Sequence, residues 1–100
     1  MRIYLDDYRE KPEGWTLAKT VEEAIELLEN NEVTHISLDH DLGMDEKTGY
    51  ALCKWMTANK KWPEHVAFHS ANPVGVHNMK AEYEFYLKHK DDIDGSVQEG

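Results

Sequence analysis

Three groups of polar side chains follow short apolar segments of this sequence, at points where strands are expected to end. The groups are Asp6-Asp7, Asp39-His40-Asp41 and His69-Ser70-Ala71-Asn72. Carboxylates, imidazoles and hydroxyls gathered in one place can bind a divalent cation, hold a phosphate and move protons during hydrolysis. Such chemistry requires a fold that brings the three groups to one location.

The apolar residues of the chain alternate between strand-like and helix-like spacing. The expected strands cover residues 3–5, 15–18, 33–38 and 65–68, and the expected helices cover about 20–30, 49–58 and 76–89. Thr20 and Glu23 have the spacing of a capping box at the start of the first helix.

This alternation predicts an α/β fold: a three-layer sandwich around a short, mostly parallel sheet of about four strands. No clear fifth strand follows Phe68. The 100 residues are expected to form a single domain, 1–100, with a flexible tail over residues 91–100. Because ligands bind beyond the carboxyl ends of parallel strands, the three polar groups are predicted to meet at one edge of the sheet.

The predicted site contains the carboxylates of Asp6, Asp7, Asp39 and Asp41. At close range in a partly dry cleft they would repel one another by several kcal/mol. A shared proton or a divalent cation relieves such repulsion. Because oxygen donors outnumber imidazoles, Mg²⁺ or Mn²⁺ is the expected metal, with Asp6, Asp7 and Asp39 as ligands. A set that includes the two histidines of these groups would instead suit Zn²⁺ or Mn²⁺.

Three further side chains are suited to binding a phosphate beside these carboxylates: Arg9, Ser70 and Asn72. The Arg9 guanidinium can brace the carboxylates or pair with phosphate oxygens, since its geometry matches both. Ser70 and Asn72 can donate hydrogen bonds to a phosphate or cap the last helix. Residues 73–75 are expected to form a tight loop beside them. The plainer alternative for the acidic groups is a set of solvated strand ends and turns.

The composition argues against other classes of function. The net charge of −9, from 20 acidic and 11 basic side chains, disfavours binding to double-stranded DNA. No apolar run approaches the roughly 18 residues of a membrane span, and the N-terminal segment is unlike a signal peptide. The single cysteine, Cys53, is expected to be a buried packing residue, and the location is expected to be cytoplasmic. The sequence does not predict the oligomeric state.

The polar groups lie within three segments that resemble one known family. The segments are LDDYREKP (5–12), SLDHDLG (37–43) and HSANPVG (69–75). In this order they resemble the cyclic-phosphate processing receiver domain, a variant of the receiver fold of two-component response regulators. The resemblance covers roughly residues 1 to 80 and implies a small receiver-like domain.

Ordinary receivers bind Mg²⁺ through an acidic pair and an acceptor aspartate, and a hydroxyl residue assists phosphoryl transfer. The resemblance places Asp6 and Asp7 at the acidic pair, Asp39 at the acceptor and Ser70 at the hydroxyl. The receiver lysine after a fifth strand has no visible counterpart, and segment 8–14 is too short for the receiver's first helix. These departures argue against phosphorelay signalling.

His40 and His69 match the variant family and not the ordinary receiver, which implies processing of a cyclic phosphate. Candidate substrates are an RNA 2′,3′-cyclic end, a cyclic nucleotide messenger or an ADP-ribose cyclic phosphate, in RNA repair or in conflict between phage and host. The resemblance thus implies a metal-dependent phosphodiesterase. Asp39 would lie at the reacting centre, one of the two histidines would act as general acid, and Asp41 would orient an imidazole.

Two other functions remain open from the sequence. A receiver-like module could bind a cyclic nucleotide or a protein partner without chemistry. A degenerate phosphorelay receiver could accept a phosphoryl group on Asp39.

Overall fold

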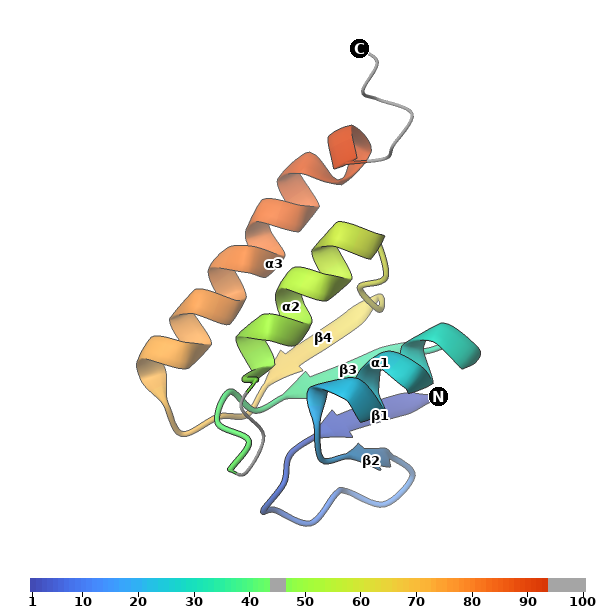
Figure 1. The fold of residues 1–100 in the computed structure, drawn as a ribbon, viewed down its shortest axis with the longest axis vertical. Coiled ribbons are helices and arrows are strands. Elements are labelled where there is room, and N and C mark those ends of the chain that lie inside the picture. The colour runs from blue at the N-terminus through green and yellow to red at the C-terminus, as the bar shows by residue number, and fades with distance from the viewer. Residues whose placement is uncertain (44–46, 94–100) are drawn as a thin grey trace.

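Within the residues that the structure describes, 1–43 and 47–93, four short strands form one sheet and three helices pack against it (Figure 1). The structure is a computed structural model. In chain order the elements are β1 (Arg2–Leu5), β2 (Thr16–Ala18), α1 (Val21–Asn30), β3 (His35–Leu38), α2 (Gly49–Asn59), β4 (His65–Phe68) and α3 (Pro73–Ile93). The strand order is β2-β1-β3-β4 and every neighbouring pair is parallel. The predicted α/β fold with a parallel sheet is confirmed.

Helix α1 begins where the capping box predicts. Thr20 is the N-cap, and its Oγ1 accepts the Glu23 backbone N–H at 3.1 Å. The Glu23 carboxylate reaches back to the Lys19 backbone N–H at 2.8 Å. Two N–H groups at the helix start are therefore satisfied by side chains.

Helix α3 begins three residues before the predicted start at 76. The Asn72 side-chain oxygen accepts the Gly75 backbone N–H at 3.0 Å, so Asn72 caps the helix. Pro73 suits the first helical position because a backbone N–H is not needed there. The tight loop predicted for 73–75 is therefore wrong, since these residues form the first turn of α3. The predicted flexible tail is helical over residues 91–93, and its remainder, 94–100, lies outside the described residues.

The apolar side chains of the inner strands pack beneath the helices. Ile3 and Leu5 of β1 and Ile36 and Leu38 of β3 are completely buried there. Cys53 of α2 is also completely buried, as the sequence predicts, and burial raises the pKa of its thiol. The cysteine is therefore a packing residue.

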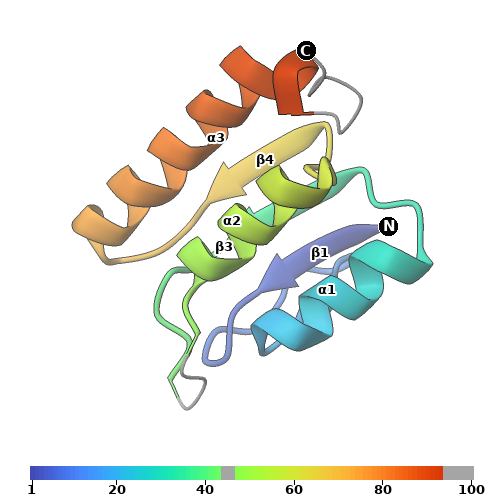
Figure 2. The same ribbon diagram turned by 45° about the horizontal axis from the view of Figure 1, so that its top comes forward.

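The three helices lie on the same face of the sheet (Figures 1 and 2). The connections from β2 to β3 and from β3 to β4 cross the sheet in the same direction, and right-handed crossovers then place α1 and α2 on one side. The step from β1 to β2 runs the other way, so a helix there would cover the opposite face. Segment 6–15 is instead a loop with breakers at Pro12 and Gly14. The predicted three-layer arrangement is therefore wrong: the described elements form two layers, with one sheet face uncovered.

Candidate functional site

The residues that directly follow β1, β3 and β4 continue the backbone hydrogen bonding of the sheet. The N–H groups of Asp6, Asp39 and His69 donate to the last carbonyl of the neighbouring strand, at 3.0, 3.1 and 3.0 Å. Since side chains alternate along a strand, these three fall on the same side of the sheet. They lie together at its carboxyl edge, as the parallel topology predicts.

Asp6, Arg9, Asp39 and His69 form a hydrogen-bonded group that we call the acidic cluster. Arg9 Nη1 lies 3.0 Å from Asp6 Oδ2 and 3.4 Å from Asp39 Oδ2. His69 Nε2 lies 2.9 Å from the same oxygen of Asp6. Asp6 is 1% exposed and Asp39 is 6% exposed. The Arg9 guanidinium thus contacts both buried carboxylates, and the His69 imidazole contacts that of Asp6.

Asp6 accepts hydrogen bonds on both carboxylate oxygens. Oδ1 accepts the backbone N–H groups of Tyr8 at 2.7 Å and Arg9 at 2.8 Å, while Oδ2 faces the Arg9 and His69 side chains. Burial alone would raise the pKa of Asp6, but these hydrogen bonds outweigh it and the net pKa is lowered. Asp6 is therefore charged at neutral pH, with its acceptor positions already occupied by the protein.

Both ring nitrogens of His69 are engaged. Nε2 faces Asp6, and Nδ1 lies 2.7 Å from Ser37 Oγ. Because an ionised carboxylate can only accept, we assign a proton to Nε2, and Nδ1 pairs with the Ser37 hydroxyl. The Tyr4 ring stacks on this imidazole, with centroids 4.3 Å apart and planes 4° apart. His69 is therefore fixed in orientation.

Ser37 and Tyr4 are absent from the site residues predicted from the sequence. The available signal was strand periodicity, because Tyr4 precedes Asp6 by two residues and Ser37 precedes Asp39 by two. Side chains two apart on a strand share a face. The strands therefore bring a ring and a hydroxyl beneath the acidic cluster.

His40, Asp41 and Asn72 form a second group, which we call the His40 group. His40 Nδ1 lies 2.8 Å from Asp41 Oδ1, and Asn72 Nδ2 donates to both oxygens of Asp41 at 3.3 Å. The hydrogen bonds from His40 and then Asn72 lower the pKa of Asp41. The ionised carboxylate places the ring proton on Nδ1. His40 Nε2 is left as an acceptor, without a hydrogen-bond partner among the described residues.

Two glycines of the predicted motifs make room for site side chains. A Cβ at Gly75, in the first turn of α3, would overlap the His40 ring. A Cβ at Gly43 would overlap the carboxylate of Asp7, and the positive φ of 55° at Gly43 also favours glycine. Asp7 is half-buried and makes no hydrogen bond or ion pair with the described residues. Its carboxylate therefore keeps its acceptor capacity.

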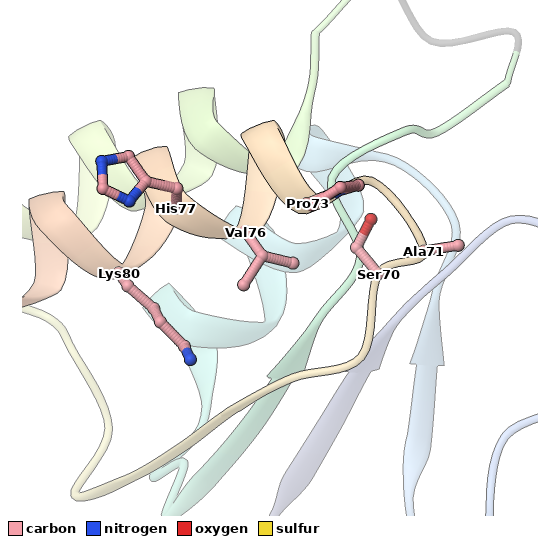
Figure 3. A pocket seen from close by; sticks show the side chains of 6 residues that line it. All are labelled: Ser70, Ala71, Pro73, Val76, His77 and Lys80. Carbon is pink, nitrogen blue, oxygen red and sulfur yellow. The ribbon is translucent and has the colours of Figure 1, made fainter.

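A surface pocket of about 480 Å³ lies between the end of β4 and the first turns of α3 (Figure 3). It is lined by Ser70, Ala71, Pro73, Val76, His77 and Lys80. Ser70 is the one lining residue that was predicted for the site, and its Oγ accepts the Asn72 backbone N–H at 3.1 Å. The carboxylates of the acidic cluster do not line this pocket, so the pocket adjoins the site and is not its centre.

The acidic cluster also has the donor atoms of a cation site. Asp6, Asp39 and His69 each offer a ligand atom within 4.8 Å of the others. Among the described residues, this is the group of three such side chains that could hold a metal ion. Asp6 and His69 already use these atoms in hydrogen bonds, whereas Asp39 Oδ2 has only the long contact to Arg9 within the described residues. Asp39 has the most acceptor capacity left for a metal ion, together with Asp7, which has no partner among residues 1–43 and 47–93.

These observations define the class of the domain. A parallel α/β sheet with an acidic pair after β1, an aspartate after β3 and a hydroxyl after β4 is a receiver-like arrangement. The family profile of the cyclic-phosphate processing receiver domain matches residues 1–84. The chain belongs to this family, which confirms the resemblance seen in the sequence.

Comparisons beyond the family profile gave no match. No curated protein and no solved structure is significantly similar to the chain. Among the described residues, none of the helices combines the length and the apolar character needed to cross a membrane.

Proposed function

We propose that this domain hydrolyses a cyclic phosphate at the carboxyl edge of its sheet, with the help of a divalent metal ion. The observation that carries the proposal is the arrangement of two buried carboxylates and an arginine beside His40, whose Nε2 has no partner in the part of the chain that the structure describes. The description of the family, cyclic-phosphate processing, supports the same substrate class. A single buried cysteine is consistent with a reducing, cytoplasmic location, which we also propose.

The donor chemistry of the site fits a hard divalent cation. Asp39 and Asp7 would hold Mg²⁺ or Mn²⁺, with Asp6 as the third carboxylate. Such an ion, when bound, polarises a phosphoryl oxygen as a Lewis acid. Arg9 supplies the positive charge beside Asp6 and Asp39 in the described arrangement, so a bound cation and the Arg9 guanidinium would compete for the same oxygens.

Arg9 is the residue best suited to bind the phosphate. Its side chain is 40% exposed and belongs to loop 6–15, so the guanidinium can turn from the carboxylates toward a ligand. The hydrogen bond with Asp6 raises the pKa of Arg9, and a guanidinium that stays charged pairs with phosphate oxygens in a forked geometry. The Ser70 hydroxyl can donate a further hydrogen bond, because its oxygen already accepts from the Asn72 backbone.

His40 is the residue best suited to move a proton. Opening a cyclic phosphate requires a proton for the departing alkoxide and the removal of one from the attacking water. His40 offers an Nε2 that has no hydrogen-bond partner among the described residues, while Asp41 orients its ring through Nδ1. His69 would have to break its hydrogen bond to Asp6 or to Ser37 before it could perform either step. We therefore assign proton transfer to His40 and the orientation of Asp6 to His69.

The proposal is tested with a panel of cyclic phosphates: 2′,3′- and 3′,5′-cyclic nucleotides and a cyclic phosphate without a base. Each is incubated with Mg²⁺, Mn²⁺ or a chelator, and ring opening is followed by phosphorus NMR. We expect turnover that requires metal and that falls at least a hundredfold in Asp39→Asn. Glu29→Gln, an exposed carboxylate on α1, is the matched control and should retain activity. No turnover of any substrate with any metal would overturn the proposal.

A second function is favoured by the completeness of the hydrogen bonding around Asp6 and His69. A network that is already satisfied can act as a rigid frame for a bound ligand without reacting. On this alternative, the domain is a module that binds a cyclic nucleotide or a protein partner. Calorimetry would then show binding of a cyclic phosphate, and the ligand would be recovered unchanged from the sample.

A further inference from the structure

The sheet face opposite the helices is partly exposed and carries an unusual set of side chains. The strand positions that face it are Arg2, Tyr4, Leu17, His35, Ser37, His65 and Ala67. Figures 1 and 2 show that α1, α2 and α3 all lie on the other side of the sheet. We call this surface the uncovered face.

Aromatic and imidazole rings form a continuous series along the uncovered face. His65 stacks on His35 at 4.3 Å, and His35 contacts Trp15 edge-on at 6.0 Å. Trp15 in turn contacts Tyr4 edge-on at 6.3 Å, and Tyr4 stacks on His69 of the acidic cluster at 4.3 Å. The series therefore leads from the amino end of the strands to the candidate reaction site.

The charge of this face differs from that of the whole chain. The protein contains 20 acidic residues and has a net charge of −9. None of the seven strand positions that face the uncovered side is acidic, and Arg2 adds a positive charge. The first carboxylates that follow on this side are Asp6 and Asp39, at the site itself. The strand positions of this face therefore present no carboxylate of their own to an anionic ligand with a flat ring.

We propose that the uncovered face binds the nucleobase of a nucleotide whose phosphate group is held at the acidic cluster by Arg9. The proposal rests on the proposed function for the position of the phosphate. Base stacking suits this face because every nucleobase offers a flat π surface and stacks on aromatic side chains without sequence preference. Tyr4 and Trp15 lie nearest to the phosphate and receive the first base.

The length of the strands distinguishes two possible sources of the base, a mononucleotide and a single-stranded oligonucleotide. His35 and His65 lie four residues before Asp39 and His69, roughly 13 Å away along the strands. A mononucleotide with its phosphate at the acidic cluster reaches Trp15 but not His65. A single-stranded oligonucleotide can continue along the face to His35 and His65.

The experiment uses ligands that the domain cannot turn over, so that binding is measured apart from hydrolysis. Adenosine 2′-monophosphate, a single-stranded tri-adenylate with a 3′-phosphate and inorganic phosphate are titrated into the protein. Calorimetry gives each Kd, and the indole N–H resonance of Trp15 reports contact with the base. The variants are Trp15→Leu and His65→Ala, with Trp55→Leu on α2, beneath the opposite face, as the matched control.

We expect Trp15→Leu to weaken adenosine 2′-monophosphate binding about tenfold and to leave phosphate binding unchanged. His65→Ala should weaken the binding of the tri-adenylate only. If His65→Ala changes the affinity for neither nucleotide, the ligand class is a mononucleotide. Trp55→Leu should bind all three ligands as the wild type does. Because His65 is exposed, its variant remains informative even if Trp15→Leu unfolds.

Three results would overturn the stacking proposal: unchanged nucleotide affinity in folded Trp15→Leu, an equal loss of phosphate affinity, or no measurable binding of either nucleotide. A Trp15 resonance that shifts with protein concentration and not with ligand would assign the face to a second copy of the chain. Failure of the proposed function is distinguishable from these results. If no cyclic phosphate is hydrolysed but Trp15→Leu loses nucleotide affinity, the hydrolase proposal fails and the stacking surface stands.

Discussion

The acidic cluster and the His40 group adjoin one another after β3, and each pairs a histidine with an aspartate. In the acidic cluster, the Asp6 side chain is completely buried and both nitrogens of His69 are engaged. In the His40 group, the Asp41 side chain is 64% exposed and His40 uses one ring nitrogen within the described residues. The same two residue types thus occur once in a closed, buried network and once in an open, solvated pair.

The two groups therefore suit two different tasks, proton transfer and the support of a buried charge, which residue types alone do not distinguish. A histidine that exchanges a proton with a substrate must present a nitrogen to it. A histidine that holds a buried carboxylate must keep its hydrogen bonds, because an unpaired buried charge is costly. His40 fits the first task and His69 fits the second. Changing one member of each pair tests whether the two histidines have these separate tasks.

Substitution of His40 should act mainly on turnover. His40→Gln should lower kcat for the cyclic substrate about a hundredfold or more, because a positioned acid–base group contributes about 10²- to 10⁴-fold. His69→Gln retains an amide that can hydrogen-bond to Asp6 or Ser37, so it should lower kcat much less and reduce mainly stability. Steady-state kinetics across pH, together with thermal unfolding of both variants, measures this difference.

The pH profile identifies which histidine moves the proton. We expect the ionisation on one limb of the kcat profile to disappear in His40→Gln and to persist in His69→Gln. The opposite pattern, with the ionisation lost only in His69→Gln, would reverse the two roles. Equal loss in both variants would show that the two groups act as one unit.

The second effect is on stability and separates Asp6 from Asp41. Asp6→Asn should lower the free energy of unfolding at pH 7 by about 2 kcal/mol, because buried donors lose a charged acceptor. Asp41→Asn is the matched control and should change stability little, since its side chain is mostly exposed. Urea denaturation in the presence of a chelator measures both differences.

The lowered pKa of Asp6 also predicts how stability depends on pH. The pKa of Asp6 is lowered in the folded state, so its contribution is complete above the unfolded value of about 3.9 and is lost as the pH falls through the lower, folded value. The stability difference between wild type and Asp6→Asn should therefore shrink below about pH 4. A difference that stays constant down to acid unfolding would show that the Asp6 charge contributes nothing to stability.

The sequence predicted the edge of the sheet at which Asp6, Asp39 and His69 lie together, for a simple geometric reason. Parallel strands align their carboxyl ends, so Asp6, Asp39 and His69 had to meet if the strands alternated with helices. The capping box at Thr20 and the buried Cys53 also follow from local pattern. In each case, the information lies within a few neighbouring residues.

The separate roles of His40 and His69 could not be predicted in this way. The hydrogen bond between Ser37 and His69 depends on the register of β3 against β4, which spacing along the chain does not specify. The start of α3 at Pro73 is also hard to predict, because proline both ends helices and occupies their first position. The uncovered face escaped prediction because it results from a missing helix between β1 and β2 and not from a residue that is present.

The smallest expected effect comes from moving the His40 ring without removing it. Gly75→Ala places a methyl group where the His40 ring lies, so the ring or the first turn of α3 must shift. Alanine is favoured over glycine inside a helix, so the substitution should not lower stability through backbone conformation. We expect kcat to fall by roughly threefold to tenfold, less than in His40→Gln, because the imidazole remains but is displaced.

Gly14→Ala is the matched control, because Gly14 has a φ of 88° and a Cβ there meets no atom within 4 Å. It should lower stability by about 1 kcal/mol through backbone strain and leave kcat unchanged. The two glycines then give opposite results: one affects turnover and the other affects stability. If Gly75→Ala left kcat unchanged while the His40 ring resonances shifted in NMR, the position of the ring would not limit the reaction. The contrast between the open His40 group and the closed acidic cluster would then lose its catalytic meaning.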